Sequence, residues 1–98
     1  MISKRFDRLP HRLVGDHEVP VATGLRARTL GLSHLDRDRA GPGLLIPRCA
    51  AVHTFGMRFL LDIHFLDSDG SILSTRRAVP SRRFVAHRGA AAVLEVPA

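Results

Sequence analysis

Two apolar segments on either side of a short polar turn constrain the fold of this 98-residue chain more than any other feature. Residues 60–66 read Leu-Leu-Asp-Ile-His-Phe-Leu and lead into Asp67-Ser68-Asp69-Gly70, and residues 71–75 lead away from that turn. Aromatic and β-branched residues favour strands, and a polar turn that ends in glycine is typical of a hairpin. The sequence therefore predicts an antiparallel β-hairpin over residues 60–75.

The rest of the chain adds further short strands and one short helix. Thr23 as an N-cap and Gly31 as a C-terminal stop predict a helix over about residues 24–30. We expect an α+β fold that is mainly β, with an antiparallel sheet or half-open barrel and this one helix. The additional strands are predicted from short apolar runs at residues 11–14, 19–22, 44–46, 51–57, 84–86 and 92–96.

The chain length fits a single domain over residues 1–98, in which residues 1–11 form a loose lead-in. The one cysteine, Cys49, excludes an internal disulfide. No apolar run approaches the ~18 residues that a membrane span needs, and the charged start lacks the apolar stretch of a secretory signal. We therefore expect a cytoplasmic protein without membrane contact.

The charge of the chain is strongly positive, with a formal net charge of +6. Five arginines lie within residues 76–88, so one alternative function is binding of a polyanion or nucleic acid through this stretch. Adjacent arginines on a strand face opposite sides, however, and the chain has no Tyr or Trp on which bases could stack. These two features argue against nucleic acid as the partner.

Several stretches resemble a known family in a fixed order over about residues 20–98. The most specific is His53-Thr54-Phe55-Gly56-Met57-Arg58-Phe59, followed by Asp62, Phe65, Asp67 and Gly70. Others are Arg28-Thr29-Leu30-Gly31-Leu32, Gly43-Leu44-Leu45 with Pro47, and Val93-Leu94-Glu95-Val96-Pro97-Ala98. Together they resemble the family of domain of unknown function 192 (DUF192). The resemblance implies a compact β-rich fold with one short helix, and it implies no established reaction.

Relatives in that family usually continue past the final Pro-Ala stretch into one more strand. In this chain, either that last strand is dispensable or the chain is a shortened version with an exposed sheet edge, which would favour pairing with another chain. A homodimer is the expectation in the second case only.

Within the most specific stretch, basic and polar side chains suggest a binding site. Arg58, together with His53 and Arg28, could receive an anionic group on a ligand. We take Arg28, His53, Thr54, Arg58 and Asp62 as the candidate ligand-binding residues. The alternative for Arg58 and Asp62, which are four residues apart, is an ion pair that holds the end of the strand.

The function that we expect is that of a non-catalytic accessory module that binds a small anionic ligand or a protein partner. A small hydrolase or transferase that uses His53 and Asp62 with Cys49 is the catalytic alternative. In an extended strand Cys49 and His53 would lie roughly 13 Å apart, so this arrangement needs a bend between them. We predict no catalytic residue set, no metal and no cofactor.

Overall fold

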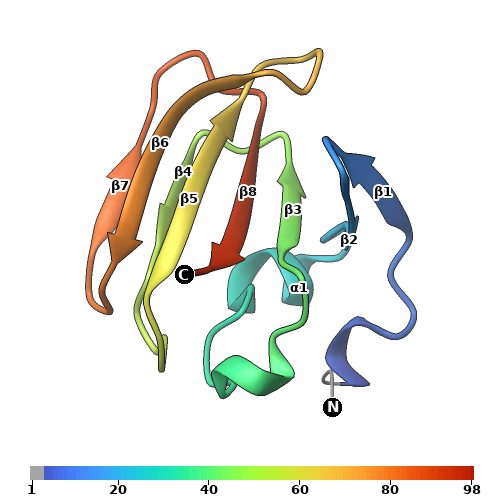
Figure 1. Cartoon of the computed structure of the whole chain (residues 1–98), viewed down its shortest axis with the longest axis vertical. Coiled ribbons are helices and arrows are strands. Elements are labelled where there is room, and N and C mark those ends of the chain that lie inside the picture. Colours follow the sequence, from blue (N-terminus) through green and yellow to red (C-terminus); the bar gives the residue numbers. More distant parts are fainter. Residues whose placement is uncertain (1–3) are drawn as a thin grey trace.

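The protein's structure, a computed structural model, describes residues 4–98, apart from the side chains of residues 4, 25, 26 and 29. It is built mainly of antiparallel β-strands with one short α-helix, as expected (Figure 1). The described elements are, in order, η1 (Lys4–Phe6), β1 (His11–Val14), β2 (His17–Pro20), α1 (Leu25–Leu30), η2 (Arg37–Arg39), β3 (Leu44–Pro47), β4 (Ala51–His53), β5 (Leu61–Leu66), β6 (Ile72–Val79), β7 (Phe84–Ala86) and β8 (Ala92–Pro97).

A four-stranded antiparallel sheet with the order β3-β8-β5-β6 forms the centre of the molecule (Figure 1). The strand β8 comes last along the chain but lies between β3 and β5. Glu95 at the middle of β8 has Leu44 of β3 and Ile63 of β5 as its cross-strand neighbours. Two further pairs, β1-β2 and β4-β7, form separate two-stranded sheets, so the described strands do not close into a barrel.

The predicted hairpin is confirmed as β5 and β6 with their connecting turn. The carboxylate of Asp67 accepts hydrogen bonds from the backbone N–H groups of Asp69 and Ser71, both at 2.9 Å. Gly70 has a φ of 86°, a conformation that glycine adopts without steric cost. The register between the two strands shifts twice, which is typical of β-bulges.

The helix α1 begins one residue later than predicted. Its N-cap is Gly24, which makes no side-chain capping bond, so the prediction of Thr23 as the cap is wrong. Gly31 ends the helix as predicted, and its N–H donates to the carbonyl oxygen of Ala27. Among the described residues no helix is long and apolar enough to cross a membrane.

The main hydrophobic cluster lies on the face of the central sheet that Leu44, Ile63, Phe65 and Val93 share. Residues from β4 and the segments around it pack onto the same cluster, among them Val52 and Met57. A smaller cluster contains Val19, Leu45, Leu66 and Leu94. The side chain of Glu95 follows Val93 on the same face of β8 and therefore points toward the larger cluster.

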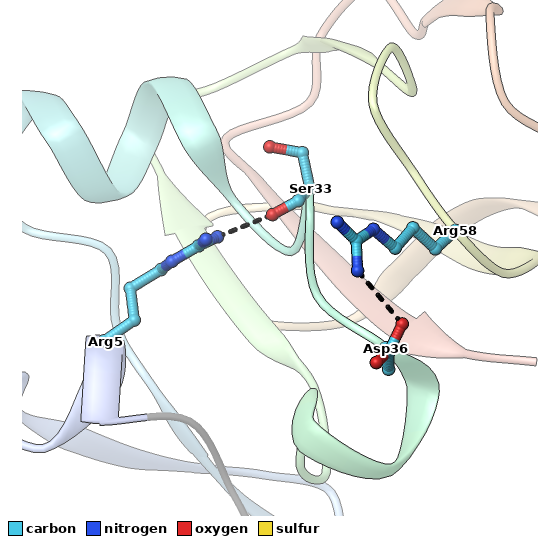
Figure 2. A network of polar contacts seen from close by, with 4 residues as sticks. All are labelled: Arg5, Ser33, Asp36 and Arg58. Atoms are coloured by element: carbon cyan, nitrogen blue, oxygen red, sulfur yellow. Dashed lines mark hydrogen bonds and ion pairs between the residues drawn. The ribbon is translucent and has the colours of Figure 1, made fainter.

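The first described residues pack on the domain, which differs from the loose lead-in expected for residues 1–11. Phe6 is 3% exposed and belongs to the main cluster. The guanidinium of Arg5 donates to the carbonyl oxygens of Gly31 (3.1 Å) and Ser33 (2.8 Å), the second of which appears in Figure 2. These contacts join η1 to the segment that follows α1. Residues 1–3 lie outside the described residues.

Candidate ligand-binding cavity beneath helix α1

A cavity of about 250 Å³ lies between α1, the segment from β3 to β4, and β8. Its polar lining comes from Arg28, Cys49, His53 and Glu95. The apolar lining comes from residues that also belong to the main cluster or flank it, namely Leu30, Leu32, Ile46, Val52 and Met57. The cavity therefore combines an apolar wall with a small number of ionisable groups, which is the usual composition of a small-molecule site.

Glu95 is the most unusual residue of this cavity. It is 4% exposed, and its Oε1 atom has no hydrogen-bond partner among the described residues. Burial disfavours the charged carboxylate and raises the pKa of Glu95 to about 7, while a backbone hydrogen bond from Leu32 opposes this shift only in part. The protonated form of this carboxyl group is therefore populated at a higher pH than that of an ordinary glutamate.

Gly31 brings the end of α1 very near to this carboxyl group. A β-carbon placed on Gly31 would lie 3.0 Å from Oε1 of Glu95, and the φ of Gly31 is 52°. Both the backbone conformation and the close approach favour glycine at this position. The end of α1 therefore lies directly against the carboxyl group of Glu95, a residue of the cavity lining.

Arg28, in the last turn of α1, brings a positive charge to the same cavity. Its Nη1 donates to the carbonyl oxygen of Pro47, and its Nη2 donates to that of Arg48 at 3.1 Å. No carboxylate lies within 4.0 Å of its guanidinium among the described residues. Carbonyl oxygens fix the side chain in place without neutralising its charge.

Cys49 and His53 line the cavity from the segment between β3 and β4 and from β4 itself. The thiol of Cys49 donates to the carbonyl oxygen of Ala51 at 3.1 Å. The Nδ1 atom of His53 accepts a hydrogen bond from the N–H of Phe55 at 3.3 Å. In neutral His53 the proton therefore resides on Nε2, which is left to act as a donor.

Thr54 is near these residues in sequence but has a different role. It is fully buried, and its hydroxyl donates to the carbonyl oxygen of Pro80 (2.7 Å) and accepts from the N–H of Arg83 (2.8 Å). These bonds attach the turn that precedes β7 to the end of β4. Thr54 is thus engaged within the protein and does not line the cavity.

Arg58 also lies away from the cavity, on the exposed surface. It pairs with Asp36 at 3.2 Å, as Figure 2 shows, with both side chains more than half exposed. The pairing of Arg58 with Asp62 that its spacing allows does not form. The chain bends at residues 58–59 before β5 begins, and Arg58 contacts Asp36, which is distant in sequence.

Asp62 supports the irregular part of β6. Its Oδ1 accepts from the N–H of Ala78 at 2.8 Å, and its Oδ2 lies 3.7 Å from the guanidinium of Arg77. Ala78 has a φ of 52°, which is unfavourable for a residue with a β-carbon. Asp62 therefore holds the bulge of β6, and it does not line the cavity with His53 and Cys49.

Comparison with protein-family models matches residues 10–98 to DUF192, described as "Uncharacterized ACR". The chain belongs to this family. A comparison with curated proteins finds no match. DUF192 membership confirms the resemblance seen in the sequence and, like the fold, leaves the reaction or ligand open.

Among solved structures, this DUF192 chain is similar to a protein from Sinorhizobium meliloti named a "putative transcription regulator". The TM-score is 0.66 at 28% identity, over 84% of this chain and 70% of that one. A protein of unknown function from Novosphingobium aromaticivorans gives a TM-score of 0.64 at 19% identity, over 83% of this chain and 64% of that one. The second likeness shows the fold alone.

Of the five candidate residues, the cavity brings together Arg28 and His53, and it adds Cys49. The DUF192 stretches also contain Glu95, which was not among the candidates. A signal for it existed, because Glu95 is the only acidic residue after Asp69 and lies within the apolar segment 92–96. Burying a carboxyl group in the middle of an apolar strand costs free energy unless a hydrogen-bond or charge partner compensates it.

Proposed function

We propose that this DUF192 protein is a non-catalytic binding module whose cavity beneath α1 holds a small ligand through an anionic group. The observation that carries the proposal is the charge of Arg28 at this cavity, unpaired with any carboxylate of the described residues. A guanidinium keeps its charge at all physiological pH values and recognises carboxylate or phosphate groups with directed N–H donors.

The surroundings of Arg28 support this assignment. The two carbonyl oxygens that hold its guanidinium use two of its five N–H donors, so donors remain for a ligand. His53 can add an Nε2–H donor at the same cavity. The apolar walls would exclude water and strengthen both interactions.

A titration of the isotopically labelled protein with acetate, pentanoate and inorganic phosphate, followed by NMR, tests this function. We expect the amide signals of Arg28, Cys49 and His53 to shift with at least one of these anions. In the variant Arg28→Gln the affinity should fall at least about tenfold, because the charged hydrogen bonds to the anion are lost.

The matched control is Arg58→Gln, which removes the same charge at an exposed position outside the cavity. It should leave the affinity within about twofold, because exposed charges contribute little. The proposal is wrong if none of the anions shifts these signals. It is equally wrong if the two variants weaken binding to the same extent.

Binding of a polyanion is a second candidate, because the solved relative from Sinorhizobium meliloti is named a "putative transcription regulator". In this chain the arginines at positions 76, 77, 82, 83 and 88 are all exposed. The catalytic alternative has less support, since Asp62 is engaged with Ala78 and Arg77 and does not line the cavity with Cys49 and His53.

The proposal includes a cytoplasmic location, where a thiol such as that of Cys49 is kept reduced. It also leaves room for a protein partner or a second copy at a sheet edge. The strand β6 lies at the end of the central sheet and exposes Ile72 and Leu73. Sedimentation at several protein concentrations would detect such a homodimer, and a single monomeric species would exclude it.

A further inference from the structure

We propose, resting on the function above, that the ligand is a small aliphatic zwitterion, whose anionic group binds Arg28 and whose ammonium group binds the carboxyl group of Glu95. The proposal is based on Arg28 and Glu95, a basic and an acidic residue that line one cavity and do not form an ion pair with each other.

One of the two oxygens of the Glu95 carboxyl group lacks a hydrogen-bond donor among the described residues. This oxygen is Oε1, and it is buried. Buried polar atoms are paired in the great majority of folded proteins, and Glu95 belongs to the cavity lining, so its unpartnered oxygen supports a partner supplied from outside the chain. An ammonium group donates three N–H bonds and carries the complementary charge.

Arg28 and Glu95 reach the cavity from different elements and stay apart. Arg28 lies on α1 and donates to the carbonyl oxygens of Pro47 and Arg48, whereas Glu95 lies at the middle of β8. Two opposite charges in an apolar setting would gain by direct pairing, because their attraction is strong at low dielectric. The fold prevents this pairing, and a ligand with both charges can satisfy the two groups at once.

The walls and size of the cavity indicate the body of the ligand. Its apolar lining includes Leu32, Ile46, Val52 and Met57, and its volume is about 250 Å³. A ligand of a few to about ten non-hydrogen atoms with an aliphatic part fits this composition. Free amino acids with aliphatic side chains, and ω-amino acids, belong to this chemical class.

Protonation of Glu95 should make the affinity for the ligand depend on pH. The unliganded carboxyl group, with its pKa of about 7, faces the cavity together with Arg28, Cys49 and His53. An ammonium group favours the ionised carboxylate, so binding at a pH below this value releases the carboxyl proton to solvent. The affinity for a zwitterion should therefore fall as the pH is lowered through 7.

The test compares two zwitterions with their deaminated analogues by calorimetry on the full chain. Leucine holds its two charges close together, and 4-methylpentanoate is its analogue without the amine. In 5-aminopentanoate the two charges are far apart, and pentanoate is the corresponding analogue. At pH 8 we expect at least one zwitterion to bind about tenfold or more tightly than its own analogue. Lowering the pH to 5 should weaken that zwitterion about tenfold or more, because Glu95 becomes protonated.

The variant Glu95→Gln keeps the size of the side chain and removes its charge. It should abolish the advantage of the zwitterion and its pH dependence, while the deaminated analogue keeps its affinity within about twofold. Preserved affinity for the analogue also shows that the variant is folded. This pattern assigns the ammonium group to Glu95 and the anionic group to Arg28.

The other outcomes separate the two proposals. If a carboxylate binds and neither zwitterion binds more tightly, the zwitterion is excluded and the anion-binding function stands. If the advantage of the zwitterion survives in Glu95→Gln, the assignment to Glu95 is wrong. If none of the four compounds binds, and acetate and phosphate also fail, both proposals fall.

Discussion

Glu95 differs from an ordinary glutamate because almost its entire side chain is removed from water. In the unfolded chain its carboxyl group would ionise near its ordinary pKa of 4.5, whereas in the folded protein the pKa is about 7. The folded state therefore holds this proton more tightly than the unfolded state does. Below 4.5 both states are protonated, and between the two values only the folded state is.

This difference predicts a pH-dependent cost of Glu95 to stability. As the pH rises from 4.5 to 7, the contribution of Glu95 to the free energy of unfolding should decline, by on the order of 3 kcal/mol in total. Glu95→Gln should therefore match the natural protein near pH 4 and exceed it in stability at pH 8. Urea unfolding of both proteins at these two pH values measures the difference, and a constant difference would contradict the raised pKa.

Single residues of the site could be predicted only in part. Arg28 and His53 stand in the stretches that resemble DUF192, and both line the cavity. Arg58 and Asp62 stand in the same stretch but contact other segments: Arg58 pairs with Asp36, and Asp62 contacts Ala78 and Arg77. Gly56, in the same stretch, lies against the ring of His34, which would be 2.8 Å from a β-carbon at this position.

At the scale of the elements, local patterns predicted local structure. The hairpin of β5 and β6 and the end of α1 at Gly31 depend on residues close in sequence, and both were predicted. The pairing of β4 with β7 and the place of β8 between β3 and β5 join distant segments. A single sequence carries no signal for which of several short strands will be neighbours.

The link between β4 and β7 depends on Thr54, and its removal should be costly. Thr54→Val keeps the shape of the side chain but leaves the carbonyl of Pro80 and the N–H of Arg83 without their partner. We expect it to lower the free energy of unfolding by about 1–3 kcal/mol. Thr54→Ser keeps the hydroxyl and should cost about 1 kcal/mol or less. Equal stability of the two variants in urea unfolding would show that these hydrogen bonds contribute little.

At the scale of the whole molecule, the positive charge is widely distributed. Arg76 and Arg77 are neighbours on β6, both exposed, and Arg77 lies 3.7 Å from Asp62. Arg82 and Arg83 belong to the turn before β7. These four arginines therefore come from two separate segments of the described chain.

Retention of the protein on heparin at different salt concentrations tests the polyanion function. If all five arginines contacted phosphate or sulfate groups together, the slope of log affinity against log salt would be about −4 to −5. We expect a slope shallower than about −2 and elution below about 0.15 M salt. A steep slope that Arg82→Ala with Arg83→Ala reduces by about two would instead favour the polyanion function.

The position of β8 also has a consequence for the order in which the protein assembles. During synthesis β3, β5 and β6 are all made before the strand that joins β3 to β5. Until β8 is inserted, β3 and one edge of β5 have no sheet partner, and contacts between segments far apart in sequence form slowly. Glu95 belongs to β8, so the insertion of this strand completes both the lining of the cavity and the four-stranded sheet. A ligand that contacts Glu95 would therefore stabilise the state in which β8 is paired with both of its neighbours.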